Sequence, residues 1–574
     1  RFRQRVFRRP LLAAWGTGIV VTVAIAAAWF LQPAADTAPA SPQLPARRYL
    51  AVLPFKDLSG RPDGPVFSRG LSDTVSMRLG RYAGVHVILP AATAGALPAG
   101  ASMRRVAQQL GATLILSGSV QRQNEELRVS YSLVDPFRGI SFAGNTVNGR
   151  IQDLWGLQDA VADAVARDLG IEQRQRPSRP AGLATAQEQE QYVRALGELD
   201  NMHDEKAVDA ALTHLYQLLE TAPDSSLVHA ALGRAYHIKY GLTRERDWAE
   251  RASRACKRAA SLDPDSPETL ITLGTVEVLL GNYEDSIAAF RKALAARPAS
   301  REAAIGLAQS LSLTRSPETE PAFRRAIAVQ PDWWYAHSAF GGHYWQRGRY
   351  DDALREFEEV IRLVPENSWG YTNAGAAHIA RGNLRDAMSM FTKATALAED
   401  PAAWLNVGYC RFFLGDFDGA ADASRKAVGL RSGNPSFWLE FADACSWSPK
   451  CRGEAPAAFA EAAKLAREEL SLNPKNARAY AVLAIALAKG GQEAEGTRAI
   501  GQAMDLDPEN PEFLFASARI ANLMERDDDA LALLKKAMAG GSYHLEYARH
   551  PEFARLRSTE SGRALLSTAV AKIN

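Results

Sequence analysis

The chain has 574 residues, of which 47% are hydrophobic and 23% are charged, so it can form several packed cores and is not a disordered chain. Its 67 basic residues nearly balance its 65 acidic residues, and the formal net charge of +2 gives no electrostatic reason to expect a nucleic-acid partner. The basic excess is local, because five arginines lie within residues 1–10.

The first predicted element is a membrane-spanning helix over residues 11–31. This stretch is uncharged, and a helix of its length rises about 31 Å, which matches the ~30 Å hydrocarbon core of a bilayer. Trp15 and Trp29 lie near its ends, where amphipathic rings favour the membrane interface. Because the basic residues of 1–10 precede it, the positive-inside bias places them in the cytoplasm as a juxtamembrane segment. We therefore expect a single-pass anchor with the bulk of the chain outside the cytoplasm.

A cleaved signal peptide is the alternative for the same stretch, because the small residues at 38–40 (Ala-Pro-Ala) have the spacing of a cleavage site. The apolar stretch exceeds the ~7–15 residues typical of such signals, which favours the anchor. Residues 32–48 are rich in Pro, Ala and Ser and predict an extended linker with little to bury.

Residues 49–172 alternate strand and helix patterns and predict a small mixed α/β domain. The apolar run YLAVLPF begins it, two strands joined by a polar turn at 123–126 form its middle, and the helical pattern of LWGLQDAVADAVARDLG closes it. Gly60, Gly64 and Gly70 form neither a phosphate loop nor a GxGxxG between strand and helix, so we interpret them as turn glycines.

Four blocks of this domain also carry a family resemblance. In order they are LAVLPFKDLSG, FSRGLSDTVSMRL, ATLILSGSVQRQNEELRVSYSLVDPFRG and LWGLQDAVADAVARDLG. They resemble the domain related to the TolB N-terminal and FlgO folds. That domain is similar to those between a signalling module and tetratricopeptide repeats in bacterial adenylate cyclases, winged-helix regulators and receptor serine/threonine kinases. The resemblance implies a sensory or scaffolding role and no established catalytic residue. Together with the predicted membrane helix and its orientation, it predicts a bacterial inner-membrane protein with its C-terminal bulk in the periplasm.

After a polar linker at 173–186, the chain becomes almost purely helical and repeats itself over residues 187–540. Small residues recur at intervals that are mostly 33 or 34 residues: Gly233, Gly274, Ala308, Gly341, Gly375, Gly408, Ala442, Ala484 and Ala518. This interval is typical of tetratricopeptide repeats, which are helical hairpins that stack into a superhelical solenoid. We expect about ten repeats, the first irregular, followed by a C-terminal helical cap over 541–574.

One repeat shows the residue pattern clearly. Gly341 allows its two helices to touch, Tyr344 packs beneath it, Gly348 makes the turn, Phe357 rebuilds the core and Pro365 ends the unit. The predicted architecture is therefore multi-domain, with one transmembrane helix, a small mixed α/β domain and an all-α solenoid.

Four residues are candidates for binding a peptide or protein in the groove of the solenoid. Asn373 and Asn406 fall at the same position of consecutive repeats, and an Asn amide offers a donor and an acceptor to a peptide backbone. Similar repeat proteins that bind extended peptides stack asparagines there. Trp345 and Trp369 are candidate apolar anchors on the same face, although an exposed aromatic can equally cover a seam between repeats.

The four cysteines predict at most one disulfide. Cys256 and Cys410 lie within repeat helices and are most simply small buried residues. Cys445 and Cys451 flank a short insertion and are close enough for a disulfide in an oxidising compartment. The ten histidines form no HExxH, and the cysteines no CxxC, so the sequence predicts neither a metal site nor a cofactor.

No catalytic constellation is present, since the chain lacks a GxSxG elbow and the kinase motif set. We expect a non-enzymatic binding and sensing module of a receptor serine/threonine kinase whose catalytic domain precedes residue 1. This interpretation allows a homodimer. The alternatives are an envelope scaffold that assembles a protein complex, and the sensor half of an adenylate cyclase or a winged-helix regulator.

Overall fold

The structure is a computed structural model, and it describes residues 48–82, 84–88, 102–171, 182–243, 245–472, 474, 476–539 and 543–573. The basic segment 1–10, the predicted membrane helix 11–31 and almost all of the linker 32–48 lie outside the described residues. No helix within the described ranges is long and apolar enough to cross a membrane. The described residues divide into two compact units, one within residues 48–88 and 112–171 and the other within residues 102–111 and 182–573.

The first unit is built on one mixed sheet. Its strands are β1 (Tyr49–Val52), β2 (Lys56–Asp57), β3 (His86–Ile88), β4 (Leu114–Gln123), β5 (Glu126–Asp135) and β6 (Ile140–Arg150). The order is β3-β1-β4-β5-β6, and β2 pairs with β4. The β1 strand runs parallel to β3 and β4, whereas β4, β5 and β6 form an antiparallel meander. All four residues of β1 are buried, as expected for a strand that lies between two parallel neighbours.

Two helices complete this unit, α2 (Gly64–Leu79) and α5 (Leu154–Asp168), and they pack against each other. The apolar face of α2 is buried, and so is Arg78, whose Nε donates to Gln158 Oε1 of α5 at 3.0 Å. Tyr131 of β5 donates its hydroxyl to Asp168 of α5 at 2.6 Å. The predicted mixed α/β region is therefore present, and its polar contacts fix α5 against both α2 and the sheet.

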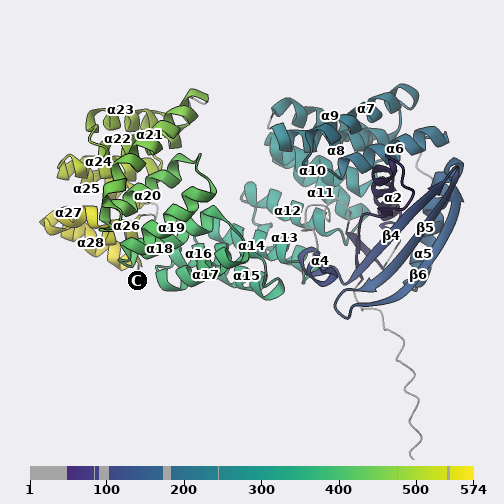
Figure 1. Cartoon of the computed structure of the whole chain (residues 1–574), viewed down its shortest axis with the longest axis horizontal. Coiled ribbons are helices and arrows are strands. Elements are labelled where there is room, and N and C mark those ends of the chain that lie inside the picture. The colour runs from purple at the N-terminus through teal and green to yellow at the C-terminus, as the bar shows by residue number, and fades with distance from the viewer. Residues whose placement is uncertain are drawn as a thin grey trace, which may run out of the picture. The chain divides into compact units, whose positions relative to one another are not determined.

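The second unit consists mainly of ten consecutive helical hairpins within the described residues (Figure 1). Their helices are α6 (Ala186–Leu199), α7 (Glu205–Thr221), α8 (Ser226–Thr243), α9 (Arg246–Leu262), α10 (Pro267–Leu280), α11 (Tyr283–Ala296), α12 (Arg301–Leu313), α13 (Thr319–Val329), α14 (Trp334–Gln346), α15 (Tyr350–Leu363), α16 (Ser368–Ala380), α17 (Leu384–Leu397), α18 (Pro401–Phe413), α19 (Phe417–Leu430), α20 (Pro435–Trp447), α21 (Ala455–Leu472), α22 (Ala477–Lys489), α23 (Glu493–Leu506), α24 (Pro511–Leu523) and α25 (Asp527–Ala539). We call the first helix of each pair the A helix and the second the B helix.

Small residues in the A helices let the two helices of a hairpin approach closely. A Cβ added to Gly341 would lie 2.5 Å from Cε1 of Phe357 on the paired B helix. The same relation holds for Gly375, where an added Cβ would lie 2.7 Å from Cε1 of Phe391. Because real Cβ atoms do not approach this closely, the recurring small residue is a packing requirement.

Helix α4 (Met103–Leu110), which the sequence places in the 49–172 domain, belongs with the repeats in the second unit. Its last carbonyls lack partners within the helix, as at every helix C-terminus. Arg301 Nη1 donates to Leu110 O at 2.6 Å, and Trp334 Nε1 donates to Gln109 O at 2.8 Å. The arginine cation also complements the negative end of the helix dipole.

Residues after the tenth hairpin form α26 (His544–Arg549), the short 3-10 helix η3 (Pro551–Phe553), α27 (Ala554–Ser558) and α28 (Glu560–Ile573). Tyr547, Phe553 and Leu556 are fully buried in one core cluster with Leu534 of α25. They cover the apolar face of the last repeat, which is the role that a terminal cap has in a solenoid.

Candidate functional site

One face of the A helices is hollowed near the C-terminal end of the solenoid. A cavity of about 380 Å³ lies there, lined by residues of α18, α20, α22, α24 and the C-terminal segment. Most of the lining residues that belong to repeats occupy fixed positions relative to the recurring small residue of their A helix. They lie six, three or two residues before it, or one, four or five residues after it. They are Tyr409, Phe412, Phe413, Ser436, Leu439, Glu440, Asp443, Arg478, Ala481, Val482, Ile485, Glu512, Phe515, Ala516 and Arg519. We call these the groove positions.

The structure places all four predicted binding residues on A helices at groove positions. Trp369 lies six residues before Gly375, Asn373 lies two residues before it, and Asn406 lies two before Gly408. Trp345 lies four residues after the small residue of its own repeat. The repeat register therefore puts the four side chains on the face that lines the cavity in later repeats, and their role in binding stays a prediction.

The tryptophans among these residues are open to solvent. Trp369 of α16 is 70% exposed and Trp345 of α14 is 45% exposed, values that are unusual for the largest apolar side chain. Tyr335, at a groove position of α14, is 39% exposed and was missed by the sequence analysis. Its repeat position could have revealed it, because it lies six residues before the small residue, as Trp369 does.

The two asparagines are half-buried, and neither side chain forms a hydrogen bond with any described residue. Each amide therefore keeps a donor and an acceptor for another molecule. Asn373 shares α16 with Trp369, whereas Asn406 lies one repeat further on, in α18.

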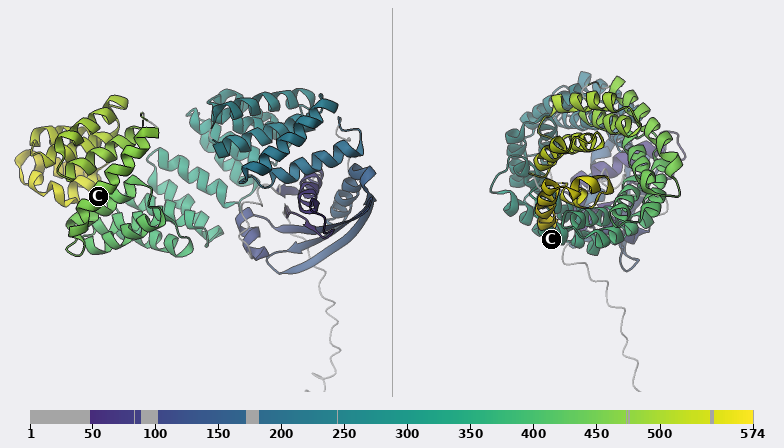
Figure 2. Two further views of the ribbon diagram at one scale, coloured as in Figure 1. Left: turned by 45° about the horizontal axis from the view of Figure 1, so that its top comes forward. Right: turned by 90° about the vertical axis from the view of Figure 1, so that its left-hand side faces the viewer.

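The groove positions of the last four repeats contact the chain's own C-terminal segment. Tyr409 of α18 donates its hydroxyl to Glu546 of α26 at 2.7 Å. The Phe412 ring lies 4.9 Å from the imidazole of His550, and Phe515 of α24 stacks on Tyr543 at 4.4 Å between ring centres. Figure 2 shows the yellow C-terminal helices inside the curve of the green repeat helices. The sequence analysis predicted the cap but not this contact.

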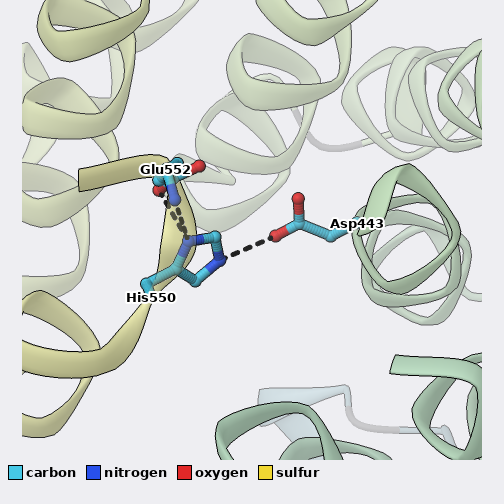
Figure 3. A group of neighbouring side chains, drawn as sticks. All are labelled: Asp443, His550 and Glu552. Atoms are coloured by element: carbon cyan, nitrogen blue, oxygen red, sulfur yellow. Dashed lines mark hydrogen bonds and ion pairs between the residues drawn. The ribbon is translucent and has the colours of Figure 1, made fainter. Parts of the chain in front are cut away.

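A buried group of charged side chains fixes the C-terminal segment in this place (Figure 3). Asp443 of α20 lies 3.6 Å from His550 Nε2, and His550 Nδ1 lies 3.7 Å from Glu552. Arg519 bridges the two carboxylates, at 2.5 Å from Asp443 and 2.6 Å from Glu552. Lys489 does the same at 2.6 Å and 2.8 Å. We call these five residues the charge clamp.

The geometry of Asp443, His550 and Glu552 also resembles a metal site, since their ligand atoms all lie within 4.8 Å of one another. Both carboxylates, however, already face the cations of Arg519 and Lys489, which would repel a metal ion from the same space. The arrangement therefore favours an ion-pair network over a metal centre.

The pKa values of the clamp carboxyls follow from this pairing. Burial opposes ionisation, but Arg519 and Lys489 outweigh it and hold the pKa of Asp443 well below its usual range. The same balance of burial against these two cations lowers the pKa of Glu552 to about 2. Both carboxylates are therefore charged at neutral pH, and the clamp depends on their charge.

Cys445 and Cys451 are joined by a disulfide in the structure, with their Cα atoms 5.1 Å apart. The bond closes the insertion that follows α20, and both residues are buried. Cys256 and Cys410 are buried free thiols within repeat helices.

The stacked helical hairpins, with the hollowed face of their A helices, define a repeat solenoid. Family profiles described as tetratricopeptide repeat match residues 271–317, 311–368 and 344–407. This part of the chain therefore consists of tetratricopeptide repeats, and such repeats indicate a protein-binding scaffold. The resemblance of 49–172 to TolB-like domains, and of the chain to receptor kinases, stays a prediction.

Curated proteins with sequence similarity to the chain include one from a bacterium and one from wheat. The chain is 26% identical over 196 residues to a Rhizobium meliloti protein named "Putative adenylate cyclase 3", a match that covers 33% of each chain. It is 30% identical over 141 residues to the Hsp70-Hsp90 organizing protein of Triticum aestivum, covering 23% of each. The matches thus span a third or less of these relatives.

Among solved structures, the MamA protein is 25% identical and matches 31% of this chain and 93% of its own, with a TM-score of 0.26.

Proposed function

We propose that the chain is the protein-binding module of a bacterial signalling receptor, and that its solenoid binds a peptide or protein segment at the groove positions of α14 and α16. The observation that carries this proposal is Trp369, a tryptophan that is 70% exposed at a groove position. It lies on the same helix as Asn373, whose amide has no partner among the described residues. An apolar anchor beside a free amide suits an extended peptide, because the ring binds a side chain and the amide binds the backbone.

The size of the expected contribution follows from the exposed area. A tryptophan offers roughly 250 Å² to a partner, so covering the exposed part of Trp369 removes about 150–180 Å² of mostly apolar surface from water. At about 25 cal/mol per Å², this stabilises the complex by ~4 kcal/mol before ordering costs. Such a value is typical of an interface hot spot.

The finer parts of the proposal rest on sequence. Residues 11–31 would anchor the chain in the inner membrane, and residues from 49 onward would lie in the periplasm. The output of the receptor would be a serine/threonine kinase, or an adenylate cyclase as in the curated relative from Rhizobium meliloti. The chain described here acts by binding, and we assign it no catalytic step. Protease protection in intact cells tests this orientation, and a cytoplasmic solenoid would contradict the receptor.

The groove proposal is tested by selecting peptides from a random display library on the chain and measuring their affinities by calorimetry. Trp369→Ala should weaken the selected peptides by about 30-fold or more, which corresponds to a hot spot of ~2 kcal/mol. Tyr283→Ala is the matched control, because Tyr283 is an exposed aromatic residue on a B helix. Equal affinities for the wild-type chain and Trp369→Ala would refute the assigned groove.

A further inference from the structure

The cavity between α18, α20, α22, α24 and α26 is distinct from the groove positions of α14 and α16, none of which line it. Its volume of about 380 Å³ lies in the range of small-ligand sites. The repeats form most of its wall, and Tyr543, Glu546 and His550 of the C-terminal segment complete it. A ligand in this cavity would therefore contact both parts at once.

Charged groups around the cavity are almost all paired. Arg478 makes a bidentate pair with Glu512, at 3.1 Å and 2.8 Å. Arg519 is held by the charge clamp, and Glu546 accepts the hydroxyl of Tyr409. Both arginines among the described residues that line the cavity are therefore already paired with carboxylates.

Glu440 is the exception in this wall. It occupies a groove position of α20 and is accessible from the cavity, yet it forms no hydrogen bond and no ion pair with any described residue. Desolvation by the protein atoms around the cavity, with the charge of Asp443 nearby, raises the pKa of Glu440 to about 7, although part of its side chain stays open to solvent. The Glu440 side chain is exposed to solvent, so its carboxylate is free to pair with a cation that enters the cavity, and the nearby charge of Asp443 adds to the attraction.

The formal charges point to the same ligand. Three cationic side chains of the wall and the clamp (Arg478, Lys489 and Arg519) face five carboxyl groups (Glu440, Asp443, Glu512, Glu546 and Glu552). The excess of carboxylates makes the site attractive to a positive ligand and unattractive to an anion.

Aromatic rings supply the rest of the wall. Tyr409, Phe412, Phe413, Phe515 and Tyr543 all line the cavity. The faces of such rings attract organic cations, and their area accommodates an alkyl chain. A hydrated metal ion makes no use of an aromatic wall, so the lining favours an organic cation.

We propose that this cavity binds a primary ammonium group on an alkyl chain, with the Glu440 carboxylate as its direct partner and the aromatic rings around its methylenes. Two sources offer this chemistry, a free alkyl amine and the lysine side chain of a partner protein. The cavity accepts either through the same contacts.

The test uses the whole chain, calorimetry, and three probes: 1,5-diaminopentane, Nα-acetyl-lysine amide, and 1-pentanol as a neutral analogue. Both amines should bind at pH 8 and pentanol should not. Glu440→Gln should weaken amine binding at least tenfold, while Glu509→Gln, an exposed glutamate outside the cavity, should leave it unchanged. Stronger binding of the diamine identifies a free amine as the ligand, and stronger binding of the lysine amide identifies a partner's lysine.

A pH series on the unmodified chain keeps the test independent of any variant. Because the pKa of Glu440 is about 7, its carboxylate is mostly neutral at pH 6, and amine affinity should fall about tenfold between pH 8 and pH 6. The other titratable or charged groups that line the cavity or act on the charge of Glu440 are Tyr409, Asp443, Arg478, Lys489, Glu512, Arg519, Tyr543, Glu546 and His550.

Absence of amine binding at millimolar concentration at pH 8 would overturn the proposal. Equal binding by Glu440→Gln, or an affinity that does not change with pH, would overturn it as well. Protection of residues 543–553 from hydrogen exchange gives a second measurement, since a ligand that contacts the C-terminal segment should raise it.

Discussion

Replacing Glu552 by Gln tests whether the charge clamp holds the C-terminal segment against the repeats. The substitution keeps the size of the side chain and removes its charge. Glu552 is only 11% exposed and faces Arg519 at 2.6 Å and Lys489 at 2.8 Å. In the variant, two buried cations share the single carboxylate of Asp443. Leaving buried charge uncompensated in this way typically costs about 3–5 kcal/mol.

An independent estimate comes from the pKa of Glu552. Its ordinary value is 4.5, and the clamp lowers it to about 2. At ~1.4 kcal/mol per pKa unit, the charged form of Glu552 stabilises the folded state by about 3 kcal/mol. Because the folded pKa is the lower one, this stabilisation is complete above pH 5 and is lost as the pH falls toward 2. The two estimates agree.

Native-state hydrogen exchange followed by mass spectrometry measures the effect where it occurs, because repeats of a solenoid unfold locally. In Glu552→Gln, the amides of residues 543–553 and of α24 should exchange faster, because the free energy of their local opening should fall by about 3 kcal/mol. Amides of α10 should not change. Glu509→Gln, which removes an exposed charge, is the control. The clamp would be refuted if Glu552→Gln changed the opening free energy by less than about 0.5 kcal/mol. It would also be refuted if the variant lost as much stability between pH 5 and pH 2 as the wild-type chain does.

Two further outcomes are expected. Gly341→Ala should lower the free energy of urea unfolding by ~1–3 kcal/mol, because the new Cβ would lie 2.5 Å from a Phe357 ring carbon. Gly342→Ala is the matched control. Its new Cβ would meet no atom within 4 Å, so this variant should be neutral or stabilising. Equal effects of the two variants would show that helix contact does not select glycine. Thiol counting on denatured, unreduced chain should find two thiols, and reduction of the Cys445–Cys451 bond should cost about 2 kcal/mol for its short loop. Four thiols in the unreduced chain would contradict the disulfide.

Much of the fold follows from the sequence, because its signals are local or periodic. The spacing of small residues locates nine of the ten hairpins, since each of these glycines or alanines lies in the first helix of a hairpin. The polar turn at 123–126 correctly predicts the β4–β5 hairpin, where Asn124 adopts a positive φ of 54°. The repeat register also puts Trp345, Trp369, Asn373 and Asn406 on the A-helix face that lines the cavity in later repeats.

Contacts between distant segments could not be predicted in the same way. His550 and Glu552 carry no periodic signal, and their partner Asp443 lies more than a hundred residues earlier in the chain. The sequence therefore indicates a cap but not its contact with the groove positions of α18–α24. Helix α4 was misplaced for the same reason, because its partners Arg301 and Trp334 belong to repeats far along the chain.

The position of the C-terminal segment has a consequence for competition. A segment tethered beside its own site acts as a ligand at an effective concentration of roughly millimolar. An outside peptide that seeks the groove positions of α18–α24 must displace it, and its apparent affinity falls accordingly. The groove positions of α14 and α16 face no such tethered competitor in the part of the chain that the structure describes. Recognition of extended peptides is thereby directed to the middle of the solenoid, and the cavity of the C-terminal repeats accepts only small molecules or single side chains that can share the space with the segment.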